Sequence, residues 1–541
     1  MATREILTIQ LGHYSNFVGT HWWNLQETNF SYDANNPSEI NADVLYREGE
    51  YQKKVTFTPR LLIADLKGTL GYLSEDGNLS EISENQINHQ PEFLWDENSV
   101  ETQEEPKTNK PPFIQSLEQA ESNGQTISFD LEKETRQWVD FLTPRFHPRT
   151  LNIISEYEHE SSSKPFDIFP YGQHIWKTKQ FSDDFVNRIR VYVEECDSIQ
   201  GFQVLFDADD GFAGLGASCM EHLKDEYSKS IITWPIIDAT PREPSVSDHM
   251  KVINSVLCWQ SAGEFSSLFS PLCCGTSGWL TPGSPRIFDN INYRSDLKYH
   301  TSALLATALD TLSLRYRHKK YPLAVMSDLC ADLNKVGRKA VATSLSLPFP
   351  MVKNHDLIDV LDDLDSNRLW TSLTPSCTIE MDNVMQSLAL KGISENRLKR
   401  PMQDAKKQME KAAYRCSSVH EMMSLYLDCT CFSSSTYLTT AGEGLKIKDP
   451  YPKVFRKNIQ RNGDFSTEDR DGDVESIPVM AGLHSGRFIA EMYESLHSQV
   501  KKIKSIRRFH AYTDSGLEED DFRESINNLL DCKENYEDHY V

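Results

Sequence analysis

One turn in the sequence has the glycine content of a phosphate-binding loop but also carries two acidic residues. The turn, Asp209 to Gly216, follows a short apolar run and has glycines at positions 211, 214 and 216. Glycine-rich turns between a strand and a helix bind phosphates because their backbone N–H groups and the helix dipole point at the anion. Asp209 and Asp210 stand where such a loop needs only amides, and their carboxylates repel a phosphate. The turn therefore predicts the frame of a nucleotide site with altered chemistry.

The segments around this turn predict a β-α-β unit. Residues 202–207 and 231–237 are apolar runs typical of buried strands. Between them, apolar residues recur at every fourth position from Leu215 to Tyr227, which indicates one face of a helix. Two further strands are expected at residues 6–11 and 61–64. All four strands should be neighbours in one sheet.

Polar residues and a glycine at the ends of these strands are candidates for the same site. Gly12 ends the first strand, and Ser15 or Asn16 can cap the helix that follows. Asp65 comes directly after the strand at 61–64. Its carboxylate either faces a ligand or is satisfied by local amides, as strand-end carboxylates often are. Both interpretations stay open.

Several blocks of the sequence resemble the tubulins, and more specifically the Misato family of tubulin-related proteins. The block "CDSIQGFQ", followed by a turn, a helix and "DEYSKSIITW", is similar to the tubulin block that carries the phosphate loop. The blocks "REILTIQLGHYSNFVGTHWWNLQE", "TPRLLIADLKGTL" and "YVEECDSIQGFQ" resemble Misato. Together with weaker stretches, the resemblance covers nearly the full length of the chain.

The resemblance implies an α/β, tubulin-like fold. It consists of a doubly wound, mostly parallel sheet of the GTPase type, a second α/β domain and C-terminal helices. The expected boundaries are 1–72 with 166–260 for the nucleotide-type domain, 73–135 for an acidic, disordered insertion, 136–165 for a Misato-specific segment, 261–480 for the intermediate α/β domain and 481–541 for the C-terminal helices.

Carried over position by position, the resemblance implies a degenerate nucleotide site. Its residues are Gly12, Asn16, Asp65, Asp210, Gly211 and Gly214. The first two glycines of the tubulin loop are Asp209 and Asp210 here, and the acid that activates water falls on Arg338. We therefore expect no catalytic residue, no metal ligand, no cofactor and little or no GTP hydrolysis. Weak GTP binding through the remaining backbone cradle stays an alternative.

The composition excludes some partners and compartments. A net charge of −24 and a pI near 5.1 argue against nucleic acid and against direct adhesion to anionic lipid. No run approaches the roughly eighteen apolar residues of a spanning helix, and the first residues lack the composition of a signal or transit peptide. The eleven cysteines are scattered, which fits reduced thiols in the cytoplasm. Any membrane association should be peripheral or through a partner.

The resemblance implies a non-catalytic tubulin-like protein that regulates mitochondrial distribution and morphology. It would work in the cytoplasm and on the cytosolic face of the mitochondrial outer membrane. Its partners would be proteins at the mitochondrial surface, with tubulin, cytoskeletal or chaperonin proteins as further candidates. Two alternatives remain: a factor in tubulin biogenesis or spindle assembly, and an active GTPase of the tubulin class. The altered phosphate loop argues against the second.

Overall fold

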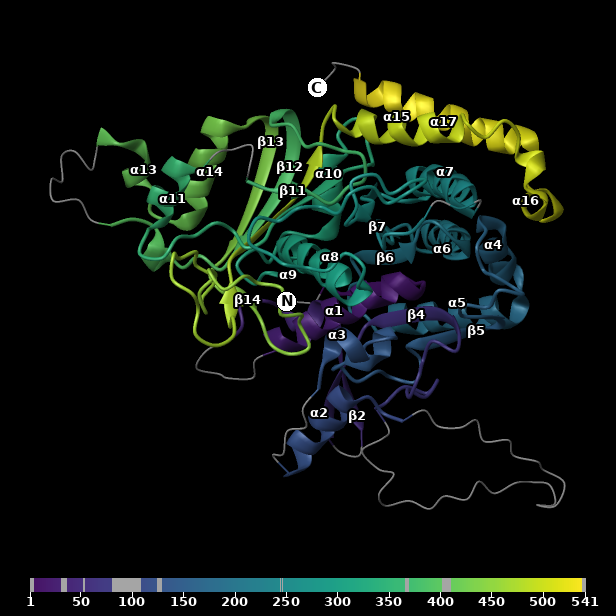
Figure 1. Cartoon of the computed structure of the whole chain (residues 1–541), viewed down its shortest axis with the longest axis horizontal. Helices are drawn as coiled ribbons and strands as arrows, with labels where there is room; N and C mark the ends of the chain where they lie inside the picture. Colours follow the sequence, from purple (N-terminus) through teal and green to yellow (C-terminus); the bar gives the residue numbers. More distant parts are fainter. Residues whose placement is uncertain are drawn as a thin grey trace.

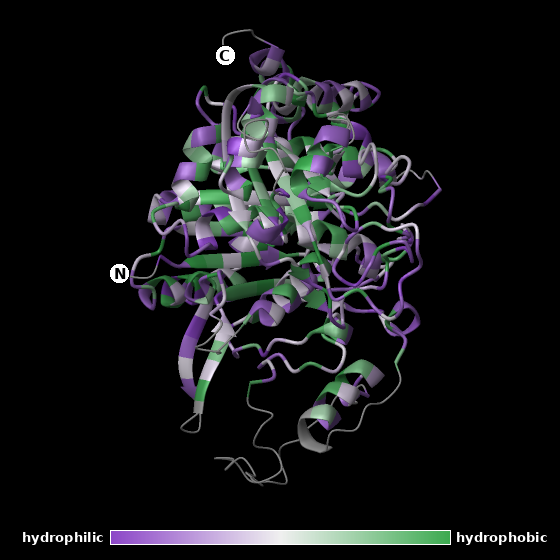
Figure 2. Ribbon diagram, turned by 90° about the vertical axis from the view of Figure 1, so that its left-hand side faces the viewer, coloured by the Kyte–Doolittle hydropathy of each residue, from purple (hydrophilic) through white to green (hydrophobic). Residues whose placement is uncertain are grey.

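Two β-sheets on either side of a central helix organise the chain (Figure 1). The computed structural model describes residues 4–30, 37–51, 54–79, 109–123, 129–243, 245, 247–364, 369–400 and 410–537. Hydrophobic segments gather on the strands and inner helices, and hydrophilic segments gather on the outer loops and helices (Figure 2).

The first sheet is seven-stranded and parallel, in the order β5-β4-β1-β6-β7-β8, with β9 also paired to β7. Its strands are β1 (Ile6–Leu11), β4 (Leu61–Lys67), β5 (Leu151–Glu158), β6 (Gly201–Asp207), β7 (Ser230–Ile237), β8 (Leu268–Phe269) and β9 (Leu272–Cys273). The chain runs outward from β1 to β4 and β5, then returns to β6 on the other side of β1. The topological switch point therefore lies between β1 and β6, the usual position of a ligand crevice in such sheets. The predicted adjacency of the four central strands is confirmed.

Helices and a hairpin surround this sheet. They are α1 (His13–Asn29), η1 (Ala42–Val44), β2 (Tyr46–Tyr51), β3 (Lys54–Pro59), α2 (Pro112–Asn123), α3 (Leu131–Glu134), η4 (Trp138–Phe141), α4 (Phe169–Lys177), α5 (Lys179–Glu194), α6 (Gly211–Tyr227) and α7 (Ser247–Phe265). Within the described ranges, strands β2 and β3 pair with each other alone, and they form the hairpin near α2 (Figure 1).

The second sheet is mixed, in the order β11-β10-β16-β12-β13. Its strands are β10 (Ala342–Ser346), β11 (Thr371–Ser372), β12 (Asp382–Lys391), β13 (Phe432–Ala441) and β16 (Val479–Ser485). Only β12 and β13 are parallel, and α14 connects them. The other elements of this half are α8 (Lys298–Leu312), α9 (Leu314–Arg317), α10 (Met326–Leu333), α11 (Leu357–Asp363), η6 (Glu395–Arg397), α13 (Ala412–Arg415), α14 (Val419–Thr430), β14 (Leu445–Lys446) and β15 (Ser476–Ile477).

The C-terminal helices lie beside the first sheet's α7. They are α15 (Ile489–Val500), η7 (Ile506–Arg508), α16 (His510–Asp514) and α17 (Glu519–Glu537). Helices α15 and α17 run side by side along one edge of the molecule, and both contact α7 (Figure 1).

Three features differ from the expected boundaries. Strand β5 pairs with β4, so residues 136–165 supply the first sheet with an edge strand. Strand β16 continues the second sheet past residue 480. Residues 80–108 of the expected disordered insertion lie outside the described residues, but α2 from the same insertion buries Phe113 and Ile114. Hydrophobic residues within an acidic stretch are enough to anchor a short helix when a core is available.

Helix α8 joins the two halves. Its residues from Tyr299 to Leu312 are all buried, because it packs against α1 on one side and against β12 and β16 on the other. A helix that is covered on all sides cannot place a charge in water, so each charged group on it needs a partner inside the protein.

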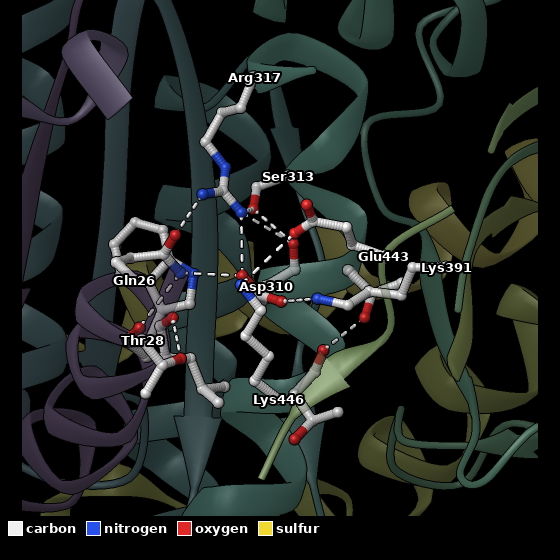
Figure 3. A network of polar contacts seen from close by, with 12 residues as sticks. Gln26, Thr28, Asp310, Ser313, Arg317, Lys391, Glu443 and Lys446 are labelled. Atoms are coloured by element: carbon white, nitrogen blue, oxygen red, sulfur yellow. Dashed lines mark hydrogen bonds and ion pairs between the residues drawn. The ribbon is translucent and has the colours of Figure 1, made fainter. Parts of the chain in front are cut away.

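Asp310 is that charged group, and it is held by a buried network (Figure 3). One carboxylate oxygen accepts from Gln26 Nε2 at 2.9 Å and Arg317 Nη2 at 3.0 Å, and the other accepts from Lys391 Nζ at 2.5 Å. Asp310, Arg317 and Lys391 are each at most 2% exposed. Burial raises the pKa of this carboxyl, but the two cations outweigh burial and lower it to about 2. The network links α1, α8, α9 and the end of β12.

We predict that Asp310→Asn lowers the free energy of unfolding by about 3–5 kcal/mol, because two buried cations lose their counter-charge. The double variant Asp310→Asn/Lys391→Met should be less destabilised than the single variant, since one of those cations is then gone. The control is Glu194→Gln, which breaks an exposed pair with Arg190 on α5 and should cost less than about 1 kcal/mol. Thermal and urea unfolding followed by circular dichroism measure all three. A single variant as stable as the control would show that the network does not hold the halves together.

Candidate functional site

The carboxylate of Asp207 occupies the N-terminus of α1 at the switch point of the first sheet. Asp207 ends β6, and its two oxygens accept from the backbone N–H groups of Tyr14 at 3.0 Å and Ser15 at 2.7 Å. The Ser15 hydroxyl donates to the same carboxylate at 2.6 Å. A helix N-terminus with free amides is an anion site, and here a carboxyl group of the chain itself fills it.

The close approach of Asp207 explains why position 12 is glycine. Gly12 has φ +115°, and a Cβ on it would lie 2.5–2.9 Å from the atoms of the Asp207 side chain. Any larger residue would displace the carboxylate from α1. Gly12 therefore serves the contact between β6 and α1.

Asp65, at the end of β4, is also satisfied internally. It is fully buried and accepts from Asn16 Nδ2 at 2.9 Å, Trp138 Nε1 at 2.8 Å and the backbone N–H of Leu66 at 2.8 Å. His13 Nδ1 lies 3.6 Å from the carboxylate. Burial raises the pKa of Asp65, but the contacts with His13, Asn16 and Leu66 outweigh it and lower the pKa below its usual range. Of the two open interpretations, local satisfaction agrees with this geometry, and Asn16 is its main side-chain donor from α1.

The two aspartates of the turn take separate partners. Asp210 is the N-cap of α6 and accepts from the Phe212 N–H at 2.8 Å. Asp209 Oδ2 lies 2.7 Å from Lys251 Nζ on α7. A second helix N-terminus at this edge of the sheet is thus also occupied by the chain's own carboxylate.

The side chain of Asn254 holds the backbone around this turn in place with hydrogen bonds. Its Nδ2 donates to the carbonyl oxygens of Asp167 and Asp209, at 2.8 and 2.9 Å. Its Oδ1 accepts from the Phe169 N–H at 2.8 Å and the Tyr512 hydroxyl at 2.6 Å. Both polar atoms of the Asn254 side chain therefore make two hydrogen bonds each, and these bonds join α7 to α4, to the turn before α6 and to the C-terminal region.

The glycines of the turn allow two helices to touch. The sequence predicts a loop up to Gly216, but α6 already begins at Gly211, so this expectation is wrong. A Cβ on Gly214 would lie 1.8 Å from the carbonyl oxygen of Phe169, and one on Gly211 would lie 2.7 Å from the Phe166 ring. A Cβ on Gly172 of α4 would lie 1.9 Å from the Gly211 carbonyl oxygen. These glycines permit close packing of α4 on α6, and tertiary packing extends the helix through residues with low helix propensity.

The six predicted site residues therefore lie at or just after the carboxyl ends of strands in the first sheet. Their polar groups, however, form hydrogen bonds within the protein. Arg338, predicted at the position of the activating acid, donates to the Asn535 carbonyl oxygen instead. The amides that would receive a phosphate already bond to Asp207 and Asp210, so the described residues do not fit a nucleotide phosphate. Among the described residues, no cluster of acidic, histidine or cysteine side chains could hold a metal ion.

Sequence reasoning missed Asp207, Trp138 and Lys251, and it named Ser15 only as a possible helix cap, whereas Ser15 donates to Asp207. The sequence does hold a signal for Asp207. It is the last residue of a mostly apolar strand run, and the Asp209–Asp210 pair follows it after one residue. Trp138 and Lys251 contact the site from distant parts of the chain, and no local pattern marks them.

Two of the aspartates resist ionisation. Burial raises the pKa of Asp207 to about 7, against the hydrogen bonds from Ser15 and Tyr14, and the charge of Asp209 adds to the rise. Burial, with the charges of Asp207 and Asp209, also raises the pKa of Asp210 well above its usual range. The burial and the neighbouring negative charge that raise these two pKa values also disfavour a further anion at this place.

Comparison with known sequences gives matches along the chain. Residues 4–119 match the family profile described as "Misato Segment II tubulin-like domain", and residues 129–318 match one described as "Tubulin domain". "Protein misato" of Drosophila melanogaster is 35% identical over 572 aligned residues, which cover 99% of each chain. "Protein misato homolog 1" is 32% identical in Mus musculus, over 97% of this chain and 96% of that one. In Homo sapiens it is 31% identical, over 99% and 98%.

We predict that Asp207 makes the protein less stable as the pH rises from about 4 to 7. In that window the unfolded chain has released this proton and the folded chain keeps it, so the folded state binds more protons and the free energy of unfolding falls. Buried histidines such as His21, whose pKa burial lowers to about 3, act in the opposite direction. The measurable quantity is therefore the difference between variants.

Urea unfolding of the wild type and Asp207→Asn across this range should give slopes that differ by up to about 1.4 kcal/mol per pH unit. The exposed variant Asp225→Asn on α6 is the matched control and should follow the wild type. Parallel curves for Asp207→Asn and the wild type would contradict a protonated Asp207 in the folded state.

Proposed function

The chain belongs to the Misato family of tubulin-like proteins, and from this premise we propose that it is a non-catalytic tubulin-like protein that regulates mitochondrial distribution and morphology. The mitochondrial part of the proposal rests on the family resemblance. The non-catalytic part rests on the geometry of the switch point.

One observation carries the non-catalytic part: the N-termini of α1 and α6 bind Asp207 and Asp210. Phosphoryl transfer depends on donors that position the phosphates and on cations that neutralise their charge. At this site the donors are committed to internal carboxylates, and Lys251 is paired with Asp209. A nucleotide would have to displace each of these contacts and face the carboxyl groups it displaced.

In this proposal the fold acts as a rigid scaffold that presents surfaces to other proteins. The carboxylates that replace a ligand fix the contacts between β1, β6, α1 and α6 without a nucleotide cycle. The protein then lacks the two nucleotide states that switch the surfaces of a GTPase.

We propose that the protein works in the cytoplasm and on the cytosolic face of the mitochondrial outer membrane, attached through proteins. Within the part of the chain that the structure describes, no helix is long and apolar enough to cross a membrane. The net charge of −24 disfavours contact with anionic headgroups, which supports protein partners over lipid.

We predict that the wild type binds GTP only weakly and does not hydrolyse it. The variant Asp209→Gly/Asp210→Gly should bind GTP about tenfold more tightly, because it removes two carboxylates and frees Lys251 to meet a phosphate. Glycine is tolerated at an N-cap at a cost of only a few tenths of a kcal/mol, so α6 should persist. Titration with a fluorescent GTP analogue measures the affinity, and phosphate release measures turnover.

The matched control is Asp225→Asn/Glu226→Gln, which removes two acidic side chains from an exposed end of α6. An equal gain in that control would assign the effect to net charge alone. Micromolar GTP affinity with Mg²⁺-dependent turnover in the wild type would refute the non-catalytic proposal.

We predict that a fraction of the protein sediments with mitochondria, is released by alkaline carbonate and is digested by protease added to intact mitochondria. Peripheral attachment through proteins leaves the chain outside the membrane and sensitive to both treatments. Resistance to carbonate, or protection from the protease, would contradict the proposed place. Sedimentation with microtubules but not with mitochondria would favour the role in tubulin biogenesis or spindle assembly.

A further inference from the structure

Strand β13 leaves one edge of the second sheet open. It is ten residues long, from Phe432 to Ala441, and pairs in parallel with β12. Among the described residues, no strand continues the sheet beyond it. An edge strand presents unpaired N–H and C=O groups, which can pair with another extended chain.

The other strand edges of the described chain are protected in ways that natural proteins use. Strands β8, β9 and β11 are two residues long. Strand β5 carries Glu156 and Glu158, and Lys164 Nζ donates to the Glu156 carbonyl oxygen at 2.8 Å. The β2–β3 hairpin carries charged residues along both strands. Short length, charges and covered carbonyl groups all prevent unwanted pairing.

Among the described residues, strand β13 is covered only near its C-terminal end, where His420 Nε2 lies 3.2 Å from the Leu438 carbonyl oxygen and Thr439, Thr440 and Ala441 are buried. Its sequence, FSSSTYLTTA, contains no charged residue and no proline, although 25% of the whole chain is charged. Threonine, tyrosine and phenylalanine favour extended structure and pair well across strands. The part of the edge from Phe432 to Tyr437 therefore stays accessible to a further strand.

Two aromatic side chains on β13 are placed to hold a partner. Phe432 is 77% exposed and Tyr437 is 40% exposed. The guanidinium of Arg315 lies 4.5 Å from the centre of the Tyr437 ring, and Arg315 itself is buried and paired with Asp332. The ring is thus held in position before any partner arrives, which lowers the entropy cost of binding.

Exposed carboxylates define the charge of that partner. Asp382 is the Cα partner of Phe432 across the β12–β13 pair, and the Phe432 N–H donates to the Met381 carbonyl oxygen at 2.9 Å. Glu380 is the residue before Met381, and Asp428 lies in the last turn of α14, four residues before Phe432. All three acids are exposed. A basic side chain there would meet these carboxylates and the face of the Phe432 ring.

We propose that the outer edge of β13 is a docking site for an extended segment of a partner protein. The segment adds to the second sheet as a further strand and places a basic residue beside Phe432. Main-chain hydrogen bonds supply the affinity, and Phe432, Tyr437 and the acidic group at one end select the sequence.

The test uses the full chain and two labelled, end-blocked, nine-residue peptides of alternating threonine and valine. One peptide has lysine at both ends, and the other has glutamate, so that either strand direction is probed. Fluorescence anisotropy should show that the lysine peptide binds at least about tenfold more tightly than the glutamate peptide. Hydrogen exchange of residues 432–441 should slow when the lysine peptide is added.

The variant Phe432→Ser/Tyr437→Ser should weaken binding of the lysine peptide by at least about tenfold. The control Val55→Ser/Ile287→Ser replaces exposed apolar residues elsewhere, 60% and 79% exposed, and should bind as the wild type does. Glu380→Gln/Asp382→Asn/Asp428→Asn should abolish the preference for lysine over glutamate without removing all binding.

Three outcomes would overturn the proposal. They are no binding of either peptide, equal binding by the wild type and the Phe432→Ser/Tyr437→Ser variant, and exchange protection outside residues 432–441 only. A concentration-dependent dimer that is lost in the same variant would assign the edge to a second copy of the chain, and would equally refute a different partner.

Discussion

The hydrogen bonds between the Asp207 carboxylate and the first amides of α1 are the contact on which the first sheet depends. They join the ends of β1 and β6, the two strands at the switch point, and they require glycine at position 12. A bound ligand usually occupies this place in a doubly wound sheet. Here a residue of the chain takes it, so the geometry of the crevice is fixed by folding and does not depend on a ligand.

A second buried contact extends this constraint across the molecule. The same helix α1 carries Gln26 near its end, and Gln26 bonds to Asp310 of α8, which also binds Lys391 of β12. The position of α1 is therefore set at one end by Asp207 and at the other by the Asp310 network (Figure 3). Buried ionic groups of this kind tolerate little displacement, because an unpaired charge in the interior is costly. The two sheets should therefore behave as one rigid body.

The sequence predicts the central strands well and the chemistry at their ends only in part. The strands at 61–64, 202–207 and 231–237 are predictable because they are mostly apolar runs, as buried parallel strands are, and the strand at 6–11 is predictable from its weak alternation. The start of α6 at Gly211 is not, since glycine is a poor helix former and only the contact with α4 explains it. Asp209 and Asp210 are visible as a departure from a phosphate loop, but the partners of Asp207 lie more than 190 positions away and Trp138 lies 73 positions from Asp65. Contacts of that range come from topology, and no local pattern encodes them.

The central claim is that internal carboxylates take the place of a nucleotide, and the nucleotide content of the purified protein tests it most directly. The protein, isolated without denaturation, is extracted with acid, and the released nucleotides are separated and quantified against protein concentration. The account predicts guanine nucleotide well below one molecule per chain, on the order of the background from a protein with no such site. About one guanine nucleotide per chain would contradict it, because the carboxylates of Asp207 and Asp210 could not then occupy the N-termini of α1 and α6.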